Sequence, residues 1–428
     1  MEQLFKLKQH GTTVKTEVMA GITTFMTMAY ILAVNPGILS ATGMPAGGVF
    51  TATALASLIA TVLMALMANL PIALAPGMGL NAFFAFTVVL GMGYTWQLAL
   101  TAVFVEGLIF IAMSFFGVRE AIIKSIPKNI KTAVSVGIGL FIAFIGLQNA
   151  GIVANNDATL VGLGAVTKGP ALVALIGLVI MGVLLAFKVK GALLIGIIAT
   201  TIVGIPFGVT TIPKGWSPVS APAAPLFFQF QFDKIFTLDF VVVMFTFLFV
   251  DIFDTIGTLV GVTTQAGLIN KNGDIPKVKQ ALLADAIGTV AGAALGTSTV
   301  TSYVESASGV AEGGRTGLTS LTTGLLFGLA LFLSPLFLLV PGAATAPALI
   351  LVGLFMLSPV KELDLSDYTE SIPAFLAMIM MPLTYSIAEG LVFGILSYIL
   401  LKLITGKAKE ISIVTWIVGA FFILKHLL

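Results

Sequence analysis

Long apolar segments follow one another along the chain, with short polar stretches between them. A helix that spans a membrane needs roughly 20 mostly apolar residues, and fourteen segments approach or exceed that length. They lie at about residues 17–34, 48–68, 71–90, 97–116, 130–147, 171–187, 192–209, 236–262, 278–295, 298–313, 316–333, 341–357, 372–386 and 391–403. A proline-rich polar stretch at 213–225 separates the first seven from the last seven. A further apolar segment at 411–424 would be either a short span or a helix lying in the membrane interface.

The composition excludes a soluble protein. Hydrophobic residues make up 58% of the chain and charged residues 9%, with a mean hydropathy of +1.10, whereas a soluble domain has about 25% charged residues. We therefore expect an all-α polytopic membrane protein. The chain has no cysteine, and its two histidines, His10 and His426, lie near its ends, so we expect no metal site, no cofactor and no thiol nucleophile. A formal net charge of +2 is too small to indicate nucleic-acid binding.

Lysine and arginine residues predict which loops face the cytoplasm, because positively charged loops stay inside. With a cytoplasmic N-terminus, the inner loops hold seventeen of them: Lys6, Lys8, Lys15, Arg119, Lys124, Lys128, Lys131, Lys188, Lys190, Lys271, Lys277, Lys279, Arg315, Lys361, Lys402, Lys407 and Lys409. The outer loops hold only Lys168, Lys214 and Lys234. This pattern predicts fourteen crossings of an inner (plasma) membrane.

An odd number of crossings in each half turns the second half upside down relative to the first. That arrangement is typical of inverted-repeat transporters. We expect a first seven-span repeat at residues 1–212, an inverted second repeat at 226–410, and a C-terminal apolar segment at 411–428.

The third span is interrupted by residues that do not fit the middle of a helix. Pro76 lacks the backbone N–H that a helix needs, and Gly77 and Gly79 follow it closely. We expect extended chain at residues 72–75, then a turn, then a half-helix. That half-helix should begin near Asn81, because asparagine is a good N-cap residue.

The tenth span, at the equivalent place in the second half, is interrupted as well. Residues 299–303 are β-branched and aromatic and so strand-like, and a half-helix should open near Val304 and Glu305. Irregular backbone at membrane depth lines a cavity, and half-helix N-termini point free N–H groups into it. Two such spans in inverted halves therefore predict a binding site near the bilayer midplane. The alternative is that the glycines only allow close helix packing.

Carboxylates within apolar spans are costly and mark candidate functional sites. Six qualify: Glu106, Asp251, Asp254, Asp285, Glu305 and Glu389. None has a basic residue within its own span. Such groups either carry a proton or line water, which is what a proton-coupled carrier requires.

Four of the polar residues could surround one small ligand. Asp251 and Asp254 stand three residues apart and so share a helix face, and Glu305 begins the half-helix of the tenth span. With Asn81, which both donates and accepts, they suit a planar heterocycle with N–H, N and C=O edges. Three carboxylates would repel an anion.

The remaining polar candidates have weaker arguments. For Asp285 and Glu106, a structural or gating role is as consistent with the sequence as ligand contact, and Glu389 should lie at the membrane interface. Side chains beside the interruptions are secondary candidates. They are Gly79, Ser302 and Tyr303, and the rings of Phe25, Phe83 and Phe84 could stack on a ligand without any one being favoured.

Four segments carry a resemblance to a known family. They are T-T-F-M-T-M-A-Y-I-L-A-V-N-P at 23–36, A-P-G-M-G-L-N-A-F-F at 75–84, D-I-F-D-T-I-G-T-L at 251–259 and T-S-Y-V-E-S-A-S-G-V at 301–310. In this order the chain resembles nucleobase–cation symporter family 2, and within it the azaguanine-like permeases for adenine, hypoxanthine and guanine. The resemblance implies proton symport by alternating access, core and gate domains each drawn from both repeats, and short strands in the third and tenth spans.

The resemblance also implies roles for particular residues. Glu305 is similar to the family's tenth-span carboxylate that binds the base, Asp254 to its eighth-span acid, Asp251 to an additional acid of the purine subgroup, and Asn81 to its third-span ligand. Thr258 stands where uracil permeases have a histidine, which makes a pyrimidine less expected. Proton coupling would then involve the three acids, and dimeric relatives suggest a homodimer. The choice among the three purines, and proton against sodium coupling, stay open.

Several other functions compete with this one. A transporter of the same fold could carry uracil, xanthine or an anion, although an anion would need positive character at the site. Asp251 and Asp254 form a D-x-x-D pair, but an intramembrane Mg²⁺-dependent enzyme would need a second pair and facing basic residues. A channel would need repeated filter residues. An ATP-driven pump would need a G-x-x-x-x-G-K-[ST] motif, which the sequence lacks.

Overall fold

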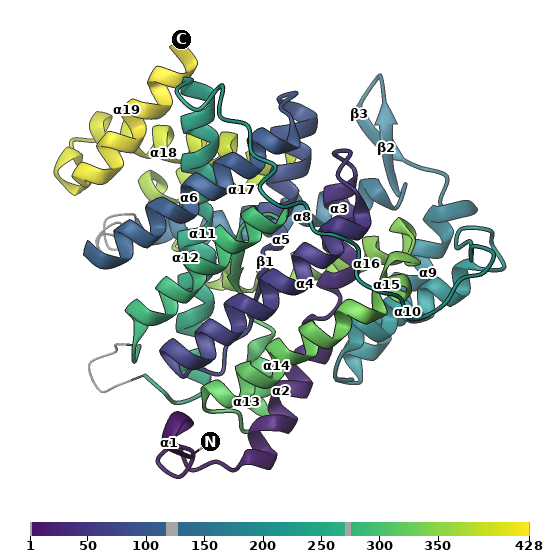
Figure 1. The fold of residues 1–428 in the computed structure, drawn as a ribbon. Helices are drawn as coiled ribbons and strands as arrows, with labels where there is room; N and C mark the ends of the chain where they lie inside the picture. The colour runs from purple at the N-terminus through teal and green to yellow at the C-terminus, as the bar shows by residue number, and fades with distance from the viewer. Residues whose placement is uncertain (1, 117–126, 270–274, 428) are drawn as a thin grey trace.

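A computed structural model describes residues 2–116, 127–269 and 275–427 of the protein, and the chain is largely helical (Figure 1). Ten of its described helices are long and apolar enough to cross a membrane, and four shorter apolar helices accompany them. The protein is therefore a multi-pass membrane protein, as its composition predicts. Three residues used for the orientation argument, Arg119, Lys124 and Lys271, lie outside the described residues.

The first half contains these helices: α1 (Glu2–Phe5), α2 (Val14–Met28), α3 (Ile31–Ser40), α4 (Ala46–Leu63), α5 (Met78–Ala82), α6 (Trp96–Phe116), α8 (Lys128–Asn149), α9 (Gly169–Ala186) and α10 (Ala192–Gly204). Two π-helical segments, η1 (Met64–Ala68) and η2 (Phe83–Gly91), extend α4 and α5. Helices α2 and α3 together form the first span, Val14–Ser40, and a local interruption at Ala29 and Tyr30, whose backbone angles stay right-handed helical, separates them. A hairpin of β2 (Val153–Asn156) and β3 (Leu160–Leu163) follows α8, and no sequence signal predicted it.

The second half contains these helices: α11 (Leu238–Gln265), α12 (Val278–Leu295), α13 (Ser306–Ala311), α14 (Gly317–Ala330), α15 (Ser334–Leu338), α16 (Gly342–Met356), α17 (Tyr368–Leu383), α18 (Ile387–Ile404) and α19 (Ile413–Leu427). Short 3₁₀ turns join some of them: η3 (Leu331–Leu333), η4 (Ser358–Glu362) and η5 (Ala408–Glu410). The last apolar segment is thus a helix that packs against α18 and α11.

The helices pack into two groups, each with members from both halves of the chain. One group gathers α2, α3, α4 and α6 with α11, α12, α13 and α14. The other gathers α8, α9 and α10 with α16, α17 and α18. Figure 1 shows α2, α13 and α14 side by side in the first group. The broken spans lie where the groups meet, since α5 and α11 both also contact α8.

The two interrupted spans meet through a pair of short strands. Strand β1 (Leu74–Pro76) pairs antiparallel with β4 (Val300–Ser302), with Ala75 opposite Thr301. Gly77 N–H donates to the Thr299 carbonyl at 2.9 Å, and Tyr303 N–H donates to the Ala73 carbonyl at 2.9 Å. The strands are shifted slightly from the expected 72–75 and 299–303.

Two threonines satisfy the outer edges of these strands. Thr61 of α4 accepts from Leu74 N–H at 2.9 Å and donates to the Leu74 carbonyl at 3.0 Å. Thr289 of α12 does the same for Val300, at 3.2 and 3.0 Å. A backbone edge inside a membrane must find partners within the protein. Each interrupted span is thus completed by a hydroxyl from the helix that precedes it, at matching places in the two halves.

The expected N-cap role of Asn81 is wrong. Helix α5 begins at Met78 with Gly77 as its N-cap, so Asn81 lies inside the helix. Its amide is engaged elsewhere: it accepts from the Ser298 hydroxyl and donates weakly to the Pro76 carbonyl at 3.4 Å. In the tenth span the half-helix α13 begins at Ser306 with Glu305 as its N-cap residue, close to where it was expected.

Candidate functional site

A cavity of about 610 Å³ lies between the two interrupted spans and helices α8, α11 and α16. We call it the central cavity. Its polar lining gathers residues from both halves of the chain: Tyr30, Lys131, Thr132, Ser135, Asp254, Thr258, Thr301, Ser302, Tyr303, Glu305, Ser358 and Glu362. Gly79 lies at its wall, where a Cβ atom would come within 2.5 Å of Ile138 Cγ2, so a side chain there would push α5 away from α8.

Asp254 and Glu305 are two carboxyl groups that line this cavity beside the strand β4 and the half-helix α13. Both are partly buried, and each lies near enough to the other to interact electrostatically. The Tyr30 hydroxyl donates to Glu305 Oε1 at 2.6 Å, which holds that oxygen and leaves the other to face a ligand. The Thr301 hydroxyl lies beside Asp254. The site therefore presents oxygen acceptors on two sides, and favours a ligand that offers N–H groups.

The strand β4 adds a hydroxyl to this lining. The side chain of Ser302 is 2% exposed, and its Oγ has no hydrogen-bond partner among the described residues. A buried polar atom without a partner costs free energy unless a ligand or water completes it. Tyr303 is held differently, because its hydroxyl donates to the Pro76 carbonyl at 2.5 Å and fixes the ring beside the cavity.

Tyr30 is a site residue that the sequence analysis missed. It is fully buried, and it lies at the turn between α2 and α3. Charged residues within spans are conspicuous in the sequence, but Tyr30 is not, because tyrosine is counted among the hydrophobic residues. A usable signal existed in the segment at 23–36, which includes it.

Asn81 and Glu106 do not line the central cavity. Both are fully buried. The Ser298 hydroxyl donates to the Asn81 amide oxygen, and the Thr299 hydroxyl donates to Glu106 Oε2 at 2.9 Å. Asn35 of α3 is also fully buried and donates to the Thr53 hydroxyl at 2.8 Å and to the Thr297 hydroxyl at 2.9 Å. These contacts hold the backbone that leads into β4.

Asp251 and Asp285 face one another rather than the cavity. The Thr255 hydroxyl lies 3.0 Å from Asp251 Oδ1 and 2.9 Å from Asp285 Oδ1, and all three residues are fully buried. Residues three apart on a helix are turned by about 60°, so Asp251 points to α12 while Asp254 points to the cavity. Asp251 therefore does not line the central cavity with Asp254, although their spacing led us to expect both beside one ligand. Asp285 lies two turns into α12.

Glu17 is a buried carboxylate that the sequence analysis did not consider. It is fully buried in the first turn of α2 and begins the first predicted span. Its oxygens accept from the backbone N–H groups of Arg315, Thr316 and Thr319 at 2.9–3.2 Å, and from the Thr319 hydroxyl at 2.6 Å. A carboxylate at a helix N-terminus is stabilised in this way. Glu17 thus attaches α2 to the start of α14.

Similar proteins identify the family of the chain. Residues 15–393 match the sequence model of a permease family. The chain belongs to this permease family. The adenine permease AdeP of Escherichia coli is 45% identical over 427 residues, which cover 99% of this chain and 95% of the relative. The guanine/hypoxanthine permease PbuG of Bacillus subtilis is 47% identical over 435 residues, which cover 99% of each chain.

The fold is that of the inverted-repeat transporters. The transmembrane domain of the cyanobacterium bicarbonate transporter BicA superposes with a TM-score of 0.66 at 15% identity, covering 89% of this chain and 97% of that domain. At this identity the likeness concerns the fold alone. The family match confirms the resemblance found in the four sequence segments, and the permeases to which the chain is similar are transporters.

Proposed function

We propose that this permease imports purine nucleobases and that the central cavity holds the base. The observation that carries the proposal is the pair Asp254 and Glu305 on the cavity wall, with Tyr30 holding one oxygen of Glu305 at 2.6 Å. A purine base has ring N–H groups that would donate hydrogen bonds to these oxygens. Its flat ring would lie against Tyr303. The names of the similar adenine and guanine/hypoxanthine permeases support the same substrate class.

The chemistry of the cavity argues against an anion as the substrate. Its only basic side chain among the described lining residues is Lys131, at the same end of the cavity as Glu362. The acids lie deeper, beside the strands. A bicarbonate transporter with this fold shares the architecture, so the difference between a base and an anion would be made by the residues at the strands.

The proposed arrangement in the membrane has fourteen crossings with a cytoplasmic N-terminus, in repeats at 1–212 and 226–410. The first packing group, around α4 and α12, would be the core domain, and the second, around α8 and α17, the gate domain. Lys131 and Glu362 then lie at the cytoplasmic mouth of the central cavity, so the structure would be inward-facing. We propose a homodimer in the cell membrane.

We propose that the permease is a proton symporter and that buried acids carry the transported proton. Thr255 has a single hydroxyl proton, so it donates to one of the two carboxyl groups at 3.0 and 2.9 Å, and the other contact needs a proton on the acid itself. Asp251 and Asp285 would thus share a proton behind the cavity. Three neighbouring acids lie on α11 and on elements packed against it: Asp254 on α11, Glu106 on α6 and Glu305 at the start of α13.

The experiment that tests this function is uptake of labelled hypoxanthine, guanine and adenine by cells that lack their own purine carriers. Uptake that collapses with a protonophore is the expected result. Glu305→Gln and Asp254→Asn should both abolish accumulation while the protein still reaches the membrane. Asp233→Asn, which removes an exposed charge from a loop, is the matched control and should take up base normally. Normal accumulation by either cavity variant would contradict the site.

A further inference from the structure

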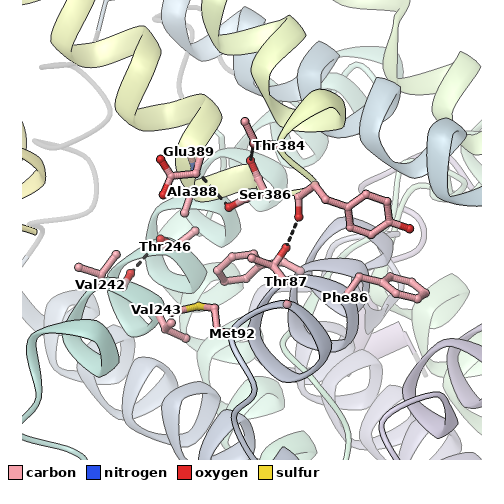
Figure 2. A pocket seen from close by; sticks show the side chains of 13 residues that line it. Phe86, Thr87, Met92, Val242, Val243, Thr246, Thr384, Ser386, Ala388 and Glu389 are labelled. Atoms are coloured by element: carbon pink, nitrogen blue, oxygen red, sulfur yellow. Dashed lines mark hydrogen bonds between the residues drawn. The ribbon is translucent and has the colours of Figure 1, made fainter. Parts of the chain in front are cut away.

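A second cavity, of about 290 Å³, lies between η2, the first half of α11 and the junction of α17 with α18 (Figure 2). We call it the outer pocket, because residues 91–92 and 384–386 at its rim belong to loops on the proposed outer side. Figure 2 shows Glu389, from the first turn of α18, on the same side of the pocket as Val242 and Thr246 of α11. No residue of the outer pocket lines the central cavity.

The three threonine hydroxyls of the outer pocket donate to backbone carbonyls. Thr87 donates to the Tyr385 carbonyl at 2.9 Å, Thr246 to the Val242 carbonyl at 2.8 Å, and Thr384 to the Met380 carbonyl at 2.7 Å. What these oxygens offer a ligand is lone pairs. The Glu389 carboxylate adds further acceptors. These acceptor groups therefore favour a ligand that donates hydrogen bonds.

The rest of the lining is apolar and aromatic, with Phe83, Phe86 and Tyr385 contributing rings. The volume is close to the lower end of about 300–1,000 Å³ found for ligand pockets, so the ligand is small. Two backbone irregularities shape the pocket. Residues 83–91 form a π-helix, and Tyr385 has a left-handed backbone with φ of 57°. Both features are enriched at functional sites, where the surrounding contacts hold them.

The outer pocket and the central cavity are separated by one turn of the third span. Gly79 lines the central cavity, and Phe83, four residues later, lines the outer pocket. The Phe83 side chain is 1% exposed, and its ring centroid lies 4.9 Å from that of Phe247 in α11. Packed aromatic rings therefore close the route between the two cavities in this structure.

We propose that the outer pocket is a second binding site for the same substrate, a small planar heterocycle with N–H groups. The base would bind there, against the acceptors of Glu389 and the threonines, before Phe83 moves and the base reaches the central cavity. This inference rests on the proposed function, because it takes its substrate class from there. It adds a site, an order of binding and a residue, Glu389, that the central cavity does not use.

The test is equilibrium binding of labelled hypoxanthine, guanine and adenine to the purified permease in nanodiscs. The wild type should bind two molecules of its base per chain. Glu305→Gln should lose the central site and keep one. Adding Glu389→Gln to that variant should weaken the remaining site about tenfold, the loss of a hydrogen bond to a charged acceptor. Asp239→Asn, which removes an exposed charge from the same end of α11, should leave both sites unchanged.

A second measurement does not depend on Glu305→Gln folding well. Glu389→Gln alone should raise the half-saturating base concentration for uptake from outside about tenfold, and leave that for efflux from inside unchanged. A wild type that binds one base per chain, or an unchanged uptake constant in Glu389→Gln, overturns the outer site while the proposed function stands. A wild type that neither binds nor takes up any base overturns both.

Discussion

The strand pair at the centre of the permease depends on two hydroxyl groups, and removing either one is the most revealing perturbation of the fold. Thr61→Val and Thr289→Val keep the shape and volume of the side chain and delete one oxygen. In the native protein that oxygen serves two backbone groups, the N–H and the carbonyl of Leu74 or of Val300. All four residues are fully buried.

The size of the effect follows from this geometry. Each variant leaves one buried N–H and one buried carbonyl without a partner, and each such group costs about 1–3 kcal/mol. The free energy of unfolding should therefore fall by about 2–6 kcal/mol. For a chain of 428 residues the entropy of unfolding makes each kcal/mol about 1 °C, so the melting temperature should fall by about 2–6 °C. The similar contacts in the two halves predict similar losses.

Thermal unfolding of the purified protein in detergent measures both losses. Thr263→Val is the matched control. Its hydroxyl is equally buried but donates only to the Leu259 and Val260 carbonyls of its own helix. Melting temperatures within about 1 °C of the wild type for both strand-edge variants would refute the reasoning, because the strand edges would then have other partners, such as water.

Three further perturbations test other parts of the account. Thr255→Val removes the hydroxyl between Asp251 and Asp285 and should change the pH dependence of base uptake while base affinity at constant pH is retained; unchanged pH profiles would argue against a shared proton there. Glu17→Gln should lower the free energy of unfolding by about 1.5–3 kcal/mol, because the charged acceptor of the α14 N–H groups is lost, and urea or thermal unfolding checks it. Gly79→Ala places a Cβ atom 2.5 Å from Ile138 Cγ2, at a cost of about 1–3 kcal/mol; weakened base binding that Ile138→Ala restores is the expected result, and a failure to restore it would exclude this clash as the cause.

Much of the fold could be predicted from the sequence because a membrane imposes few patterns. Apolar length located most helices, and proline with glycine located the interruption near Pro76. The interruption of the helix at Ala29 and Tyr30 could not be predicted, because the sequence on both sides is apolar and neither residue is a proline or a glycine. The β2–β3 hairpin is short and exposed, so its sequence carries little hydrophobic alternation.

The site could be predicted in part. Asp254 and Glu305 were found because an acid within an apolar span is conspicuous, and the structure places both at the central cavity. Asn81 and Asp251 were grouped with Asp254 and Glu305, because the spacing of residues along a helix predicts only roughly which way a side chain points. Which neighbour a side chain meets, Asp285 or the cavity, depends on tertiary packing. Tyr30 was missed because tyrosine is counted as hydrophobic, although its hydroxyl can form hydrogen bonds.

The same fold can serve substrates of opposite character. In this permease Glu305 is the N-cap residue of the half-helix α13, so a carboxylate lies beside the N–H groups at the start of that helix. The structure of a bicarbonate transporter shares the architecture at 15% identity. Because the fold is shared, the proposed preference of the central cavity for N–H donors has to come from its side chains, such as Asp254 and Glu305.

The central claim is that Glu305 accepts an N–H group of the base, and a double-mutant cycle of protein and ligand tests it most directly. The dissociation constants of the preferred purine and of its ring N-methylated analogues are measured for the wild type and Glu305→Gln. The account predicts that one methylation weakens wild-type binding by about 1.5–3 kcal/mol and costs less in Glu305→Gln, because the amide that replaces the carboxylate is uncharged and has only one acceptor oxygen. Additive losses for every analogue would contradict the claim.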